Sequence, residues 1–149
     1  MSTTHLLYLH GFRSSPQSAK AQIMAQWVQT LHPGVTWWCP QLPASPAQAV
    51  ALLLQGMAVW PRGHMAVMGS SLGGFYAAWL SAHLSIPAVL INPAVHPARD
   101  LARYIGEHPV WQDPAQSIFF EPAHVQELVQ LEIQPPPTLP STLALIAKG

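Results

Sequence analysis

The sequence predicts an α/β domain with a doubly wound, mainly parallel central sheet. Three observations predict this fold class: apolar runs alternate with candidate helices, the runs show little polar alternation, and few residues are charged. Half of the 149 residues are hydrophobic and 8% are charged, so much of the chain must be interior. A chain of this length fits one domain, and we expect a single one over 1–149.

The predicted strands are short apolar runs bounded by turn residues. Parallel strands that are covered on both faces read as continuous runs of this kind. Five segments fit the description: 6–10, 35–39, 65–69, 87–92 and 142–147.

A candidate helix follows each of the first four runs. Ser15 and Ser45 are each followed by proline, a typical signal for the start of a helix, which predicts helices over about 16–31 and 47–59. The other two helices are predicted over about 71–84 and within 97–105.

Right-handed crossovers favour the strand order 2-1-3-4-5, in which the carboxyl ends of the first and third strands are neighbours. This order puts the first helix on one face of the sheet and the next three on the other. The segment 106–140 interrupts the alternation and is too long for an ordinary connection. We expect it to hold a short strand and a short helix, as a lid-like excursion over the carboxyl edge of the sheet.

Charge and cysteine content exclude several classes of protein. Six basic and six acidic residues give no net charge, so neither nucleic acid nor a membrane surface is an expected partner. Cys39 is the single cysteine, which excludes an internal disulfide and a zinc site of paired thiols, and we expect no metal and no cofactor. Neither a signal peptide nor a membrane span is recognisable, so a cytoplasmic location is expected. The six tryptophans are expected in core or helix packing.

The segment VMGSSLGGF, 67–75, places the pattern G-x-S-x-G between a predicted strand and a predicted helix. Gly69, Ser71 and Gly73 occupy the pattern, in the strand-to-helix context that a nucleophilic serine of this type requires. Glycine on either side leaves room for the strained turn, and the first N–H groups of the helix face the point where charge develops on an attacked carbonyl. Ser71 is the candidate nucleophile, in preference to Ser70. The alternative is a flexible glycine and serine link without chemistry.

A phosphate-binding turn is disfavoured. The chain contains neither G-x-x-x-x-G-K nor G-x-G-x-x-G, and no lysine or arginine lies between Gly63 and Arg99. A flavodoxin-like binder is disfavoured for the same reason, because no phosphate-binding loop follows the first strand.

The segment LHGF, 9–12, ends the first predicted strand. Gly11 lets the backbone bend so that the Phe12 N–H joins the Leu72 N–H in binding an oxyanion. The alternative is a plain strand-to-helix turn that needs Gly11 for its backbone angles. His10 is expected to fix this loop through hydrogen bonds to backbone rather than to act as a base.

Four segments together resemble a known family: LLYLHGF with SSPQSAKA, PQLP, GSSLGGFYAAWL, and INPAVHP. In order and spacing they resemble the small bacterial YqiA-like esterases of the α/β-hydrolase superfamily, from about Leu6 to the end of the chain. The resemblance implies an α/β-hydrolase-like fold and hydrolysis of carboxylic esters, or of thioesters such as acyl-coenzyme A, through an acyl-serine. It implies Ser71 as the nucleophile and the N–H groups of Phe12 and Leu72 as the oxyanion hole.

The sequence departs from the pattern of this superfamily near its C-terminus. In α/β-hydrolases the acid of the catalytic triad follows a late strand and the histidine follows the last one. Because the sequence ends at Gly149, we expect the acid, the last strand, the histidine and the closing helix to be missing. Six acids and histidines that follow Ser71 could replace the missing members of the triad, but their positions in the sequence give weak support for this role. They are Asp100, Asp113, His83, His96, His108 and His124.

Two functional expectations follow from this departure. The chain is a serine esterase with weak or no activity by itself, or it is a non-catalytic α/β module that binds an acyl ligand or a partner protein. Without a closing helix, part of the sheet is bare and the strand at 142–147 is an open edge, so self-association through this strand is expected.

Overall fold

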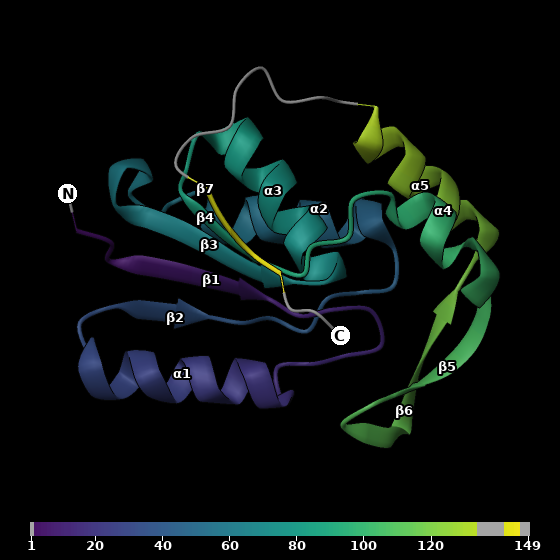
Figure 1. Ribbon diagram of the computed structural model, residues 1–149, viewed down its shortest axis with the longest axis horizontal. Coiled ribbons are helices and arrows are strands. Elements are labelled where there is room, and N and C mark those ends of the chain that lie inside the picture. The colour runs from purple at the N-terminus through teal and green to yellow at the C-terminus, as the bar shows by residue number, and fades with distance from the viewer. Residues whose placement is uncertain (1, 134–141, 147–149) are drawn as a thin grey trace.

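A five-stranded parallel sheet forms the centre of the computed structural model, which describes residues 2–133 and 142–146 (Figure 1). Its strands lie in the order β2-β1-β3-β4-β7, and every neighbouring pair is parallel. The predicted fold class and strand order are confirmed, because β7 takes the place of the fifth predicted strand. The strands are β1 (His5–Leu9), β2 (Thr36–Trp38), β3 (Met65–Ser70), β4 (Ala88–Ile91) and β7 (Thr142–Leu145).

Three long helices cover the sheet. α1 (Ala19–Leu31) lies on one face, and α2 (Pro46–Met57) and α3 (Leu72–Leu84) lie on the other (Figure 1). Ser45 caps α2 as predicted, since its Oγ accepts a hydrogen bond from the Gln48 amide at 3.1 Å. A single turn of 3₁₀ helix precedes β3.

The predicted start of α1 next to Ser15 is wrong. Ser18 is the N-cap residue, and its Oγ accepts a hydrogen bond from the Ala21 amide at 3.2 Å. Ser15 is buried and donates its hydroxyl to Gln112 Oε1 at 2.9 Å. This partner lies 97 residues away along the chain, so a local pattern could not distinguish the two serines.

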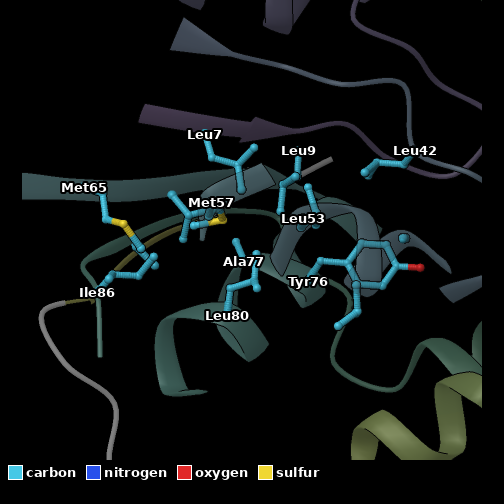
Figure 2. Close-up of a cluster of buried hydrophobic side chains, with 14 of the residues drawn as sticks. Leu7, Leu9, Leu42, Leu53, Met57, Met65, Tyr76, Ala77, Leu80 and Ile86 are labelled. Atoms are coloured by element: carbon cyan, nitrogen blue, oxygen red, sulfur yellow. The ribbon is translucent and has the colours of Figure 1, made fainter. Parts of the chain in front are cut away.

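The main hydrophobic core lies between the sheet and the α2–α3 layer. Leu7 and Leu9 of β1 and Met65 and Val67 of β3 point into it, and the residues between them face the other way. Figure 2 shows that side chains of both helices meet these strands, among them Leu53, Met57, Ala77 and Leu80. Burial of each large side chain contributes about 1.5–3 kcal/mol, so this layer fixes β1 and β3 firmly.

The chain after β4 forms a second layer at the carboxyl edge of the sheet (Figure 1). β5 and β6 pair antiparallel as a hairpin, so the prediction of a single strand there is wrong. Pro109 and Pro114 obscured the pattern, because proline is tolerated only in edge strands and both strands of a hairpin are edges. The elements of this layer are α4 (Pro97–Leu101), a 3₁₀ turn (Ala102–Tyr104), β5 (Gly106–Val110), β6 (Asp113–Phe120) and α5 (Pro122–Glu132).

Helix α4 belongs to this second layer, whereas the sequence had placed it over the sheet. Ala98 of α4 packs with Phe120 and Leu128 in a small core of its own. Glu127 of α5 joins the layer to the start of α2, because its Oε1 accepts hydrogen bonds from Ser45 Oγ at 2.6 Å and from the Ala47 amide at 2.9 Å. A carboxylate is favoured at a helix N-terminus, so this contact helps to hold the second layer in place.

The face of the sheet opposite α2 and α3 is only partly covered. Val89 pairs in register with Leu143, and Ile91 with Leu145, so the four side chains share this face. Leu143 is 55% exposed and Leu145 is 48% exposed. Within the described part of the chain, no further strand follows β7 in the sheet.

We expect this apolar edge to drive self-association. The double substitution Leu143→Lys and Leu145→Lys removes apolar surface and puts charge on an edge strand. Light scattering over a concentration series should therefore give a lower mean mass for this variant than for the parent. Val59→Lys, at a side chain that is 93% exposed elsewhere, is the matched control and should behave like the parent. A parent that stays monomeric throughout would contradict the prediction.

Candidate active site

Ser71 lies on the sharp turn between β3 and α3. Its backbone angles, φ 55° and ψ −118°, cost a non-glycine residue about 1–3 kcal/mol. A serine at this N-cap position usually accepts a hydrogen bond from the helix backbone, but the Ser71 side chain does not. The backbone is held from β4 instead, since the Ser71 amide donates to Ile91 O at 3.0 Å and the Ala94 amide donates to Ser71 O at 2.9 Å. The turn thus presents an exposed hydroxyl that is not used for capping.

Two glycines make this turn possible, because backbone passes too close to them for any side chain. A Cβ atom at Gly69 would lie 2.1 Å from the carbonyl oxygen of Gly73. A Cβ atom at Gly73 would lie 2.1 Å from the carbonyl oxygen of Leu9. Backbone atoms cannot rotate away as a side chain can, so both positions require glycine.

The loop after β1 lies directly beside Ser71. A Cβ atom at Gly11 would lie 3.3 Å from Ser71 Cβ and 3.8 Å from Ser71 Oγ. The loop is closed by a 3.1 Å hydrogen bond from the Ser14 amide to Gly11 O, and Arg13 takes a left-handed conformation with φ 62°. The loop after β1 and the turn at Ser71 are therefore neighbours, as the strand order predicts.

Several backbone amides at this junction have no hydrogen-bond acceptor among the described residues, and those of Phe12 and Leu72 are among them. Leu72 is the first residue of α3, where the amide has no partner within the helix. Unpaired amides at a helix start attract negative charge. The Leu72 amide, next to Ser71 in the chain, is therefore suited to bind a negatively charged oxygen.

His10 is buried at 4% exposure and joins two loops. Its Nδ1 lies 2.8 Å from Gly11 O, and its Nε2 accepts the Leu42 amide at 2.9 Å. An imidazole that donates from Nδ1 and accepts at Nε2 is neutral. Burial lowers the pKa of His10, although its hydrogen bond with the Gly11 backbone acts in the opposite direction. The ring holds the loop that carries Phe12.

The lowered pKa of His10 predicts a loss of stability in acid. The unfolded chain takes up a proton on this ring below about pH 6.5, whereas the folded chain resists it, so the free energy of unfolding should fall as the pH drops below that value. His10→Ala should cost about 2 kcal/mol at pH 8, because the Leu42 amide loses its acceptor, and should reduce the acid sensitivity. Denaturant titrations at pH 8 and pH 5.5 measure both effects. His32→Ala, at an exposed histidine, should keep the full acid sensitivity.

A cavity of about 450 Å³ opens over Ser71. This volume falls within the roughly 300–1,000 Å³ that is usual for small-molecule sites. Of the predicted site residues, His10, Gly11, Phe12 and Ser71 lie in its wall. Leu72 lies in the wall of a smaller adjoining cavity that shares the loop after β1, and Gly69 and Gly73 are buried beneath the turn.

Among the residues of this wall that sequence reasoning missed are Tyr8, Lys20 and Trp111. The sequence held a weak signal for a functional role of Lys20, because a positive charge in the first turn of a helix is unfavourable next to the helix dipole. Trp111 had none, and its expected place in the core or in helix packing is wrong, since it is 62% exposed and lies outside any helix. It comes to the site on the tip of the β5–β6 hairpin.

The hairpin tip is bonded to the loop that carries Phe12. The Trp111 amide donates to Arg13 O at 2.9 Å, and Arg13 Nε donates to Pro109 O at 3.1 Å. The Arg13 guanidinium lies 3.6 Å from the centre of the Trp111 ring, a favourable cation–π contact. The second layer therefore closes one side of the cavity.

No histidine or acidic side chain hydrogen-bonds to Ser71, although all eight histidines and all six acidic residues of the chain lie within the described segments. His96 is exposed at the start of α4 and makes no capping bond. The other five candidates bond elsewhere: His83 to Trp79 O, His108 to Tyr104 O, His124 to the Glu121 amide, Asp100 to Arg99, and Asp113 to the Ala115 amide.

Three further observations concern residues 2–133 and 142–146, the part of the chain that the structure describes. No group of three histidine, cysteine or acidic side chains there is placed to hold a metal ion. Burial raises the pKa of the Cys39 thiol to about 11, so this thiol stays protonated at neutral pH. Within the same segments, no helix has the length and apolar character needed to cross a membrane.

Solved structures with this architecture have the α/β-hydrolase fold. Alpha/beta hydrolase domain-containing protein 10 from mouse matches with a TM-score of 0.68 and 12% identity, over 99% of this chain and 81% of its own. Est1E from Butyrivibrio proteoclasticus matches with a TM-score of 0.56 and 12% identity, over 87% of this chain and 60% of its own. Carboxyl esterase 2 from the fungus Tuber melanosporum matches with a TM-score of 0.50 and 16% identity, over 99% of this chain and 59% of its own.

The structural matches show that this chain has an α/β-hydrolase fold. The family follows from the sequence. The chain belongs to the uncharacterised protein family UPF0227, whose model matches residues 5–147. This match confirms the family resemblance that the ordered motifs predict.

Proposed function

We propose that this chain carries the acyl-transfer site of a serine esterase, with Ser71 as nucleophile and the Phe12 and Leu72 amides as oxyanion hole. The observation that carries the proposal is the turn at Ser71. A strained, exposed serine that does not cap its helix lies beside two unpaired amides, at a cavity of about 450 Å³. Strain of this kind persists where function requires it.

The reaction takes two steps. Ser71 Oγ attacks the carbonyl carbon of an ester or thioester. The negative oxygen of the tetrahedral intermediate accepts hydrogen bonds from the Phe12 and Leu72 N–H groups. The bond from carbon to the alcohol or thiol then breaks, and the leaving group departs with the proton that Ser71 lost. Water attacks the acyl-serine in the second step, which releases the carboxylic acid and restores the hydroxyl.

Turnover by this chain is expected to be weak. The proton of Ser71 needs an acceptor, and no histidine or acid among the described residues bonds to it. In a serine protease, loss of the base costs about 10⁶ in turnover, while about 10³ over water remains from binding and the oxyanion hole. Acylation is thus expected to be slow.

The same observation favours a second candidate function, in which the chain binds an acyl ligand or a partner protein without hydrolysing it. A module of this kind would hold an ester in the cavity and leave it intact. The two functions differ in whether a covalent bond to Ser71 ever forms.

Covalent labelling distinguishes the two candidate functions. The chain is incubated with a fluorophosphonate, and the product is analysed by intact mass and by peptide mapping. One adduct on the peptide that contains Ser71 is expected from an acyl-transfer site, and heat-denatured chain should give none. Absence of an adduct after prolonged incubation, or adducts scattered over several serines, would overturn the esterase proposal.

A further inference from the structure

The cavity over Ser71 contains one cationic side chain, Lys20, and no acidic one. Lys20 Nζ lies 3.5 Å from Ser70 Oγ, and Ser70 is the residue immediately before Ser71. Both ion pairs found in the described part of the chain lie elsewhere, at Arg99–Asp100 and His124–Glu121. The ammonium is therefore close to the reacting centre and is not neutralised by the protein.

Structural roles account poorly for this lysine. It lies in the first turn of α1, where the helix dipole opposes a positive charge. Its single hydrogen bond, to Ser70, is long. The other cation nearby, Arg13, is already engaged with the Trp111 ring and the Pro109 carbonyl.

Lys20 is also poorly placed to be the missing base. Lysines that act as bases in serine hydrolases are desolvated, and Lys20 is exposed. Its charge is better suited to attract a ligand. Ser70, which is 7% exposed, and Tyr8, which is 1% exposed, add buried hydroxyl groups to the same part of the wall.

We infer that Lys20 determines specificity by binding an anionic group, a carboxylate or a phosphate, that the ester carries near its carbonyl carbon. This inference rests on the proposed function, since it names the class of substrate that the Ser71 site takes. The anion could belong to the acyl part or to the leaving group. Both sources present the same charge to the ammonium.

Three esters distinguish these sources. p-Nitrophenyl butyrate is neutral, the mono-p-nitrophenyl ester of glutaric acid carries a carboxylate on its acyl part, and 4-(butyryloxy)benzoate carries one on its leaving group. Acylation rates are measured at low ionic strength for the parent, Lys20→Met, Lys20→Arg and Arg62→Met. Arg62 is a matched control, because it is exposed and its guanidinium bonds to Leu84 O in a different part of the chain.

We expect Lys20→Met to lower the rate for an anionic ester about tenfold and to leave that for the butyrate unchanged. A loss confined to the glutarate ester assigns the anion to the acyl part, and a loss confined to the benzoate assigns it to the leaving group. Lys20→Arg should keep most of the rate, and Arg62→Met should match the parent. Equal effects on all three esters, or none, would overturn the inference.

A binding measurement keeps the inference separate from the esterase proposal. Glutaric acid mono-p-nitroanilide and butyric p-nitroanilide are amides that Ser71 will not cleave on the time scale of a calorimetric titration. The parent should bind the anionic amide about tenfold more tightly than Lys20→Met does, and the two should bind the neutral amide alike. Tighter binding of the anionic amide by the parent would support the inference even if Ser71 took up no fluorophosphonate. Absence of labelling would overturn the esterase proposal alone. Equal binding of the anionic amide, or none, would overturn the inference.

Discussion

The Ser71→Ala chain is expected to take up no fluorophosphonate under conditions in which the parent takes up one equivalent. Labelling requires Oγ to attack phosphorus, so that a P–O bond forms and the P–F bond breaks. The phosphoryl oxygen then occupies the place of the oxyanion, next to the unpaired amides of Phe12 and Leu72. Without the hydroxyl the first bond cannot form, so the effect should be complete and visible by intact mass.

Ser70→Ala is the matched control for this experiment. Ser70 is adjacent in sequence but buried at 7% exposure, whereas Ser71 is exposed. The Ser70→Ala chain should therefore be labelled like the parent. Circular dichroism of both variants shows whether they are folded. Labelling of folded Ser71→Ala, or loss of labelling in folded Ser70→Ala, would assign the nucleophile elsewhere.

Gly73→Ala is expected to lower the free energy of unfolding by about 3 kcal/mol or more. The new Cβ atom would lie 2.1 Å from Leu9 O and 2.6 Å from His10 O. Both are backbone atoms at the end of β1, so relief requires α3 to move away from the sheet. Thermal melting followed by circular dichroism should show a midpoint roughly 10 °C below that of the parent.

Gly34→Ala controls for the general effect of replacing a glycine. A Cβ atom at Gly34 meets no atom within 4 Å, so the change should stay within about 0.5 kcal/mol of the parent. A Gly73→Ala chain that melts with the parent would show that the turn at Ser71 is looser than these distances imply. The Ser71 side chain would then lack a fixed position.

The sheet and the turn at Ser71 could be predicted because each depends on a local pattern. Continuous apolar runs marked the buried strands, and the handedness of crossovers fixed their order. The two glycines around Ser71 predicted close backbone contacts, and these contacts are present. His10 could be assigned to its loop because a histidine next to a glycine turn has backbone partners within reach.

The rest depends on contacts between segments that are distant in sequence. Ser15 and Ser18 are equivalent as local signals, and they differ in the structure because the Ser15 hydroxyl donates a hydrogen bond to Gln112 Oε1. Lys20 becomes part of the cavity only because β1 ends beside β3, which brings α1 close to Ser70. The hairpin was obscured because prolines in edge strands read as turns.

If this chain acts as the proposed esterase, the bonds between the hairpin tip and the loop after β1 tie substrate access to transition-state stabilisation. Arg13 O and Arg13 Nε both bond to the hairpin, and Arg13 directly follows Phe12, whose amide is proposed to bind the oxyanion. If the hairpin swings outward to admit a bulky ester, it pulls on the peptide beside the Phe12 amide. The proposed oxyanion hole would then reach full electrostatic strength only after the hairpin had returned, so a wide-open entrance and a competent oxyanion hole would exclude each other.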